Sequence, residues 1–386
     1  MMKRALLTLA ALLPLLSPPA AAVTADGAMW NATAVGDVGY LPLEDLRSFY
    51  KFMTLTSPGD GAISIGNGAV SLVFGPDPRE LRIRGCRCLL THPAQRDSLQ
   101  GLLVSKTDMV KLIDPVLRPT YIANRRLVKT VIIDPAHGGH DTGTVTPYAR
   151  EADVALLVAH RLRTLLTERG YHVVLTHEDN RYLSDQQRVD VAGRELNPIF
   201  LSLHLNSGRS DISGVETYTM APCAPQEKPL PGNEYDAANA ALAVALHSSL
   251  LRHTGAQDGA CRRAHYSLLS SVRCPAAMVE LGYATNKEEG ERLNTEEYQA
   301  KLAQALADGI DAFAAVMNPE TTLHAAPKPV VQEAPAPTKV EAGKQQPPKD
   351  AAKNPTKGNK KQPAKPTKPA PKPATKPTPK PAPRRR

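Results

Sequence analysis

The sequence predicts an α/β protein with a mostly parallel sheet flanked by helices, preceded by a small β-rich α+β module and followed by a disordered tail. Three observations carry this prediction. Between residues 36 and 120, short apolar runs alternate with Gly/Pro turn signals, which is typical of a small sheet. From 129 to 317, such runs alternate with long amphipathic segments, as in βαβ units. After residue 318, proline and lysine replace apolar residues, so no core can form.

The first 22 residues are typical of a secretory signal peptide. Lys3 and Arg4 precede an apolar run at 5–16, and Ala20-Ala21-Ala22 offers the small residues of a cleavage site. A membrane anchor is the alternative interpretation, but a spanning helix needs about 20 apolar residues, and prolines interrupt this run. We therefore expect an exported protein.

The 36–120 region is predicted to be a β-rich accessory domain, with strands at 62–65, 69–74 and 81–84. This region contains the segment "YLPLEDLRSFY", then hairpins, then the segment "GLLVSKTDMVKLIDPVLRP". In this order, the segments resemble the copper amine oxidase N-terminal-like domain. That resemblance implies an adhesion or stalk module, and no copper site is expected in it.

The 129–317 region is predicted to be a second, larger domain, and it carries the clearest alternation of strands and helices. Strands are expected at 130–134, 172–176, 199–204, 214–219, 266–269 and 276–281. Helices are expected at 153–169, 185–196, 235–253 and 296–316.

Five cysteines in an exported chain leave at least one unpaired. Cys86 and Cys88 lie too close along one strand to bridge comfortably. Cys223, Cys261 and Cys274 allow one disulfide, and their spacing does not choose the pair. Because no Cys-x-x-Cys pair occurs, a cysteine-based zinc cluster is not expected.

Four polar side chains stand where predicted strands end or a helix begins: His137, Glu151, His204 and Glu280. Strand ends are where α/β proteins build their sites. Two histidines and two carboxylates suit a hydrolytic zinc site, in which three ligands leave a position for water and a free carboxylate takes its proton. Taken singly, each residue has a structural alternative, such as a glutamate that offsets a helix dipole.

Five blocks occur in a fixed order: "TVIIDPAHGGHDTGT", "READVALLVAHRL", "NPIFLSLHLNS", "GVETYT" and "PAAMVELGYATN". Over residues 129–316 they resemble the zinc-dependent N-acetylmuramoyl-L-alanine amidases of the cell-division and sporulation type. The resemblance implies Zn²⁺ held by His137, Glu151 and His204, with Glu280 as the general acid/base. It implies a periplasmic or wall-associated peptidoglycan hydrolase that cleaves the amide between the lactyl group of N-acetylmuramic acid and L-alanine.

Two other functions stay open: a zinc peptidase acting on another wall peptide, and a catalytically silent wall-binding protein. Several residues near the predicted site are also open to two interpretations. We expect His140 to face solvent or the substrate groove rather than the metal. Arg262 and Arg263 are either a groove contact for a stem-peptide carboxylate or a solvated pair. Asn206 and Asn286 are candidate substrate contacts.

The tail at 318–386 holds 17 of the 35 prolines, and from residue 319 it has 16 lysines and arginines against four acidic residues. This composition predicts an extended, disordered polycation. It is either a soluble spacer or an electrostatic attachment to an anionic wall polymer or membrane surface. Nucleic acid is not an expected partner. The sequence leaves the oligomeric state, activating proteins and the preferred form of peptidoglycan open.

Overall fold

The computed structural model describes residues 21–23, 29–68, 70–123, 125–223 and 227–318. The predicted signal peptide lies outside these residues except for its last two positions, and the predicted tail lies outside them except for Asn318. Among the described residues, no helix has both the length and the apolar character needed to cross a membrane.

The C-terminal part of the described chain alternates strands and helices. Its strands are β12 (Thr130–Pro135), β13 (His172–Leu175), β14 (Pro198–Asn206), β15 (Val215–Met220), β16 (Asp258–Ala264) and β17 (Ala276–Tyr283). Its α-helices are α4 (Glu151–Glu168), α5 (Asp185–Ala192), α6 (Asp236–Thr254), α7 (Ser267–Ser271), α8 (Lys287–Leu293) and α9 (Glu296–Met317).

The N-terminal part is mostly strand. Its strands are β1 (Ala21–Val23), β2 (Met29–Asn31), β3 (Thr33–Val35), β4 (Val38–Pro42), β5 (Thr54–Gly59), β6 (Ala62–Gly66), β7 (Ser71–Phe74), β8 (Glu80–Ile83), β9 (Cys86–Leu89), β10 (Gln95–Asp97) and β11 (Gly101–Ser105). Its α-helices are α1 (Leu43–Phe49), α2 (Lys106–Asp108) and α3 (Asp114–Leu117), with a π-helix at Met109–Ile113 between the last two.

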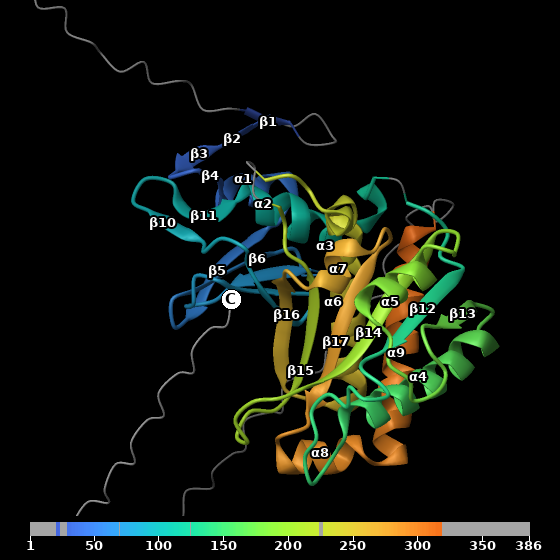
Figure 1. Ribbon diagram of the computed structural model, residues 1–386. Coiled ribbons are helices and arrows are strands. Elements are labelled where there is room, and N and C mark those ends of the chain that lie inside the picture. The colour runs from blue at the N-terminus through green and yellow to red at the C-terminus, as the bar shows by residue number, and fades with distance from the viewer. Residues whose placement is uncertain (1–20, 24–28, 69, 124, 224–226, 319–386) are drawn as a thin grey trace, which may run out of the picture. The chain divides into compact units, whose positions relative to one another are not determined.

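One sheet of 11 strands runs through both parts, in the order β13-β12-β14-β17-β15-β16-β9-β8-β7-β6-β5 (Figure 1). Strands β13, β12, β14 and β17 are parallel, β15 is antiparallel to β17, and β16 is parallel to β15. The predicted mostly parallel sheet with flanking helices is confirmed. A second sheet, β10-β11-β4-β3, completes the N-terminal part.

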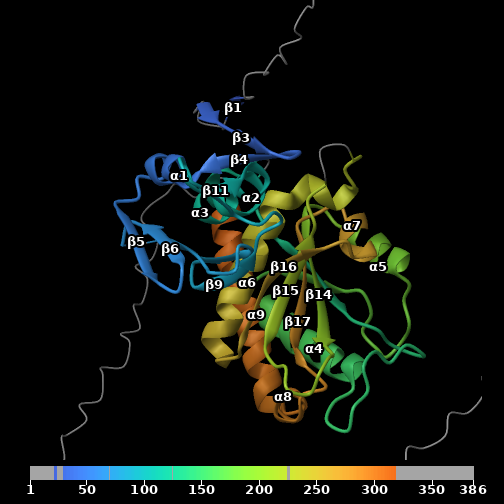
Figure 2. The ribbon, with the colours of Figure 1, turned by 90° about the vertical axis from the view of Figure 1, so that its left-hand side faces the viewer.

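The N-terminal part joins the larger sheet edge to edge. Strand β9 pairs in parallel with β16, where Cys88 is the partner of Cys261 (Figure 2). The apolar core of the N-terminal part also includes Ala240 and Val244 of α6. Cys261 packs in this shared core, whereas Cys274 packs on the opposite face of the sheet, so these two cysteines are not disulfide partners.

The strand predicted at 266–269 is wrong. These residues lead into the short helix α7, and the strand comes earlier, as β16. Leu268 and Leu269 are buried, and a short apolar run fits a buried helical turn as well as a strand. The sequence of β16, "DGACRRA", has no alternation of apolar and polar residues. The hydrophobic pattern therefore did not predict this strand.

The two faces of the central sheet are covered unequally. Along β12, β14 and β17 alternate side chains point to opposite faces, and Ile133, Leu203 and Val279 pack with α4, α6 and α9 in the larger core. The other face packs against α5 and α7. These two short helices come just before β14 and β17, so they lie toward the amino ends of the strands (Figure 1).

A buried ion pair ties α5 to β12. Arg188 Nη1 lies 2.6 Å from Asp134 Oδ1, and Thr176 Oγ1 and Ser202 Oγ each donate to the Asp134 carboxylate at 2.7 Å. Arg188 also donates to the carbonyl oxygens of Pro135 at 2.7 Å and His137 at 2.9 Å. The network therefore fixes the start of the turn that follows β12.

We predict that Arg188→Met lowers the free energy of unfolding by about 3–5 kcal/mol, because it leaves Asp134 as a buried charge without its cation. Urea denaturation of the full chain measures this. The control is Arg209→Met, which removes an ion pair with Asp211 whose arginine side chain is 77% exposed, and should cost less than about 1 kcal/mol. Equal losses in the two variants would contradict the prediction.

Candidate metal centre

The turn after β12 presents His137 in an unusual backbone conformation. His137 has φ +62°, and Gly138 and Gly139 have φ +122° and +61°. A Cβ on Gly138 would lie 2.3 Å from the carbonyl oxygen of Arg181, so only glycine fits there. A histidine at positive φ is strained by about 1–3 kcal/mol, which is typical of functional sites.

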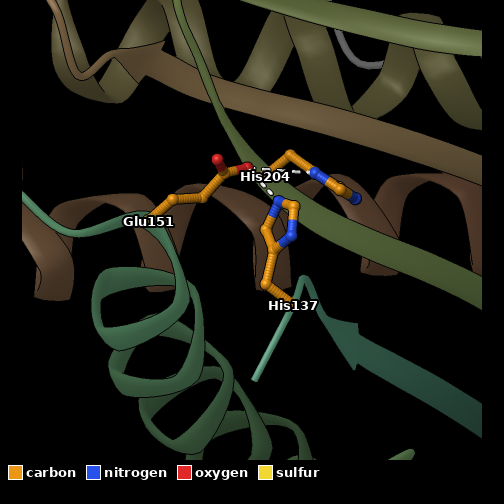
Figure 3. Close-up of side chains that lie close together, drawn as sticks. All are labelled: His137, Glu151 and His204. Carbon is orange, nitrogen blue, oxygen red and sulfur yellow. Dashed lines mark hydrogen bonds and ion pairs between the residues drawn. The ribbon is translucent and has the colours of Figure 1, made fainter. Parts of the chain in front are cut away.

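His137, Glu151 and His204 converge at the carboxyl ends of β12 and β14 (Figure 3). Glu151 is the first residue of α4, and its Oε1 lies 3.0 Å from His137 Nε2 and 3.1 Å from His204 Nδ1. One ligand atom from each side chain falls within 4.8 Å of the others. The structure thus brings together the three residues predicted to hold a metal.

The surroundings of these side chains fit a metal ion with nitrogen and oxygen ligands. Asp141 Oδ2 lies 2.8 Å from His137 Nδ1, which leaves Nε2 to face a metal, as in carboxylate–histidine–zinc arrangements. A Cβ on Gly143 would lie 2.5 Å from His137 Cδ2 and 2.6 Å from Glu151 Oε2, so this glycine leaves the space that the ligands need. Two imidazoles and one carboxylate are the kinds of ligand that bind a divalent metal ion.

The charges around the site favour a cation. Burial lowers the pKa of His137, but hydrogen bonding and charge interaction with Glu151, together with Asp141, outweigh burial and raise that pKa to about 9. Burial raises the pKa of Glu151, but hydrogen bonds from His137 and His204 outweigh burial and hold that pKa far below its usual range. The raised pKa means that His137 holds a proton next to the Glu151 carboxylate. A bound metal ion would take the place of that proton.

Glu280 lies beside the cluster on the next strand. In β17 it is the register partner of His204 in β14, so both side chains project from the same face of the sheet. Its Oε2 is buried and has no hydrogen-bond partner among the described residues. Burial raises the pKa of Glu280 to about 7, although the charge of His204 opposes the shift.

Other residues singled out in the sequence have different places. His140 is exposed, its ring centroid lies 4.3 Å from that of Tyr182, and it does not belong to the group of three converging side chains. Asn286 accepts from the amide of Glu289 and so caps α8. Arg263 contacts Thr91 and Asp108 of the N-terminal part.

Asp141 and Gly143 were not given roles from the sequence. Both belong to the same block as His137, and a carboxylate four residues after a predicted ligand is a signal that could have identified Asp141. The role of Gly143 depends on the close approach of the Glu151 side chain to His137 and Gly143. Only the fold brings these residues together.

Comparison with known proteins identifies a family for the C-terminal part of the described chain. Residues 131–312 match the family model described as N-acetylmuramoyl-L-alanine amidase. Protein YqiI of Bacillus subtilis, whose function is uncharacterised, is 32% identical over 186 residues, which are 48% of this chain and 84% of YqiI. The chain belongs to the N-acetylmuramoyl-L-alanine amidase family.

Relatives that are named as amidases also match about half of this chain. The amidase LytC of Bacillus subtilis is 31% identical over 183 residues, which cover 47% of this chain and 34% of LytC. The germination-specific N-acetylmuramoyl-L-alanine amidase of the same organism is 29% identical, over 47% of this chain and 78% of that relative. The solved catalytic domain of the amidase CwlV from Bacillus (Paenibacillus) polymyxa is 31% identical, with a TM-score of 0.43 over 49% of this chain and 99% of the solved domain.

Family membership makes this protein a cell-wall amidase, which implies peptidoglycan as substrate and action outside the cytoplasm. His137, Glu151 and His204 form the candidate metal site of the amidase.

We predict that Gly143→Ala weakens metal binding by about 10- to 100-fold, the usual effect of disturbing the groups that orient metal ligands, because the added methyl group meets His137 and Glu151. Gly170→Ala is the matched control: Gly170 also has positive φ, at +88°, but a Cβ there meets nothing within 4 Å. Zinc titration against a competing chelator compares the two. Equal affinities would contradict the proposed fit of Gly143.

Proposed function

We propose that this amidase is a zinc enzyme that hydrolyses the amide between the lactyl group of N-acetylmuramic acid and L-alanine of the stem peptide. His137, Glu151 and His204 hold the ion, and Glu280 is the general acid/base. The observation that carries the proposal is the buried, unpartnered Oε2 of Glu280 beside a cluster of three metal-ligating side chains.

The donor set supports zinc. Catalytic zinc sites use three protein ligands of this kind and keep one position open. When bound, Zn²⁺ supplies Lewis acidity, which polarises a carbonyl group and brings the pKa of water down to about 7. Asp141 orients the His137 ring, and Glu151 is held by the amides of Thr144 and Leu205 at 2.9 and 3.1 Å.

Glu280 moves the proton. Its Oε2 accepts a proton from the attacking water while the water oxygen bonds to the lactyl carbonyl carbon. Glu280 then returns this proton to the nitrogen of L-alanine as the carbon–nitrogen bond breaks. The glycan keeps the lactyl carboxylate, and the stem peptide leaves with a free amino group. Burial suits this role because it brings the pKa of Glu280 to about 7.

In this proposal, the remaining parts of the chain export the enzyme and hold it at the cell wall. The signal peptide at 1–22 directs export to the periplasm or cell wall, the accessory domain at 36–120 supports the catalytic domain at 129–317, and the basic tail from 318 attaches to an anionic wall polymer or membrane surface. The charge and proline content of the tail support this last role.

We predict that Glu280→Gln keeps zinc and lowers kcat by at least about 100-fold, because general acid–base catalysis contributes about 10²- to 10⁴-fold. His137→Ala should lose zinc as well as activity. Metal analysis and initial rates of the purified full chain separate the two effects. Full hydrolysis by Glu280→Gln would contradict the role of Glu280.

We also predict that the zinc-loaded protein releases free stem peptides from purified sacculi and leaves the glycan strands intact. Chelation should abolish the release, and added Zn²⁺ should restore it. Mass spectrometry of the soluble products identifies the bond cleaved. Cleavage inside the peptide would instead indicate a zinc peptidase, and metal binding without any product would indicate a silent wall-binding protein.

A further inference from the structure

A row of polar side chains continues from the metal site across the sheet, beyond Glu280. Glu216 of β15 is the register partner of Glu280. Arg262 of β16 is the register partner of Tyr218, two residues after Glu216 on the same strand. Register partners project from the same face of a sheet. Glu280, Glu216 and Arg262 therefore form a row across the neighbouring strands β17, β15 and β16.

A bulge in β16 places Arg262 on this face. Val215 pairs with Asp258, but Thr217 pairs with Cys261, so β16 holds one extra residue. Ala260, inside the bulge, has φ +91°, a strained conformation for a residue with a side chain. A one-residue shift exchanges the faces of all later side chains. Without the bulge, Arg262 would face α6, and Cys261 would lie on the face that carries Glu216 and Glu280.

Glu216 supports Arg262. Its buried carboxylate receives the hydroxyl of Tyr218 at 2.6 Å, the Asn206 amide at 3.0 Å and the Tyr283 hydroxyl at 3.1 Å. Arg262 Nη2 lies 2.9 Å from Glu216 Oε1. These three hydrogen bonds hold the Glu216 carboxylate in place. The carboxylate in turn positions the Arg262 guanidinium.

Arg262 keeps donors available on its outer edge. Its Nε donates to the carbonyl of Gly259 at 3.0 Å, whereas Nη1 makes no hydrogen bond to any described residue. The side chain is 33% exposed. Arg263 points to the other face and is engaged by Thr91, Asp108 and Lys111. Of this neighbouring pair, only Arg262 lies on the face of the sheet that carries Glu216 and Glu280.

We propose that Arg262 binds a carboxylate of the stem peptide and thereby sets the direction in which the substrate lies. This inference rests on the proposed function. The site around Glu151, Glu280 and Glu216 is rich in carboxylates, so an anionic peptide needs a cation there, and a guanidinium matches a carboxylate in shape and charge. The peptide then extends from the metal site over β15 toward β16.

The test uses two soluble muramoyl peptides that differ only in a carboxylate or a carboxamide on the residue after L-alanine. With the zinc-loaded full chain, kcat/KM should favour the carboxylate by about 10- to 100-fold, as expected for charge-assisted hydrogen bonds. Arg262→Met should remove this preference by lowering kcat/KM for the carboxylate substrate only. The control Arg209→Met, at an exposed arginine after β14, should keep the preference.

Equal loss on both substrates would overturn the proposal, since it would mean that Arg262 only supports the fold around Glu216. If Arg262→Met does not fold, Arg262→Lys retains a charge opposite Glu216 but loses the planar fork, and the preference should fall to a few-fold. An unchanged preference in Arg262→Lys would also overturn the proposal.

A binding measurement separates this inference from the proposed function. Calorimetry with the free stem peptide, in carboxylate and carboxamide forms, needs no turnover. Wild type should bind the carboxylate form more tightly by a similar factor, and Arg262→Met should bind both forms equally. If neither muramoyl peptide is cleaved, the proposed function is wrong, and the calorimetric preference still decides the role of Arg262.

Discussion

Strand register at the centre of the sheet is the constraint on which the site depends. His204, Glu280 and Glu216 project from one face because β14, β17 and β15 pair with these three residues opposite one another. A slip of one residue in any strand would turn its functional side chain into the core beneath α4, α6 and α9. The apolar residues between them, such as Leu203 and Val279, hold the register because their burial is lost in any shifted pairing.

Buried carboxylates in and around this site differ in how many cations and hydrogen-bond donors they have. This difference distinguishes the structural carboxylates from the reactive one. Asp134 has Arg188 and two hydroxyl groups, Glu216 has Arg262 and three neutral donors, and Glu151 has two histidines and two amides. Glu280 differs, because one of its oxygens is buried without a partner. An unsatisfied buried carboxylate costs stability, and its retention beside the metal ligands is consistent with a reactive group.

The N-terminal part contributes to the same folded unit as the amidase residues. Its strand β9 extends the sheet from β16, its core includes side chains of α6, and Arg263 joins Asp108 across the boundary. Asp258, at the start of β16, accepts from the amide of Arg87 and lies 3.0 Å from buried His247 of α6. The bulge that places Arg262 on the face of Glu216 and Glu280 therefore starts at a residue that is held by both parts of the chain.

The sequence by itself determined the fold class and the three side chains that the structure brings together as a candidate metal site. The apolar runs before His137, His204 and Glu280 make buried strands, and parallel strands bring their carboxyl ends to one edge; family-like blocks then selected these residues and Glu151 from many polar candidates. Local pattern failed at 266–269, where a short apolar run is helical, and at β16, whose polar residues show no period of two. Only the tertiary structure decided the space left by Gly143 and the face of the sheet on which Arg262 lies. These features depend on register and close approach between segments distant in sequence, which no local pattern encodes.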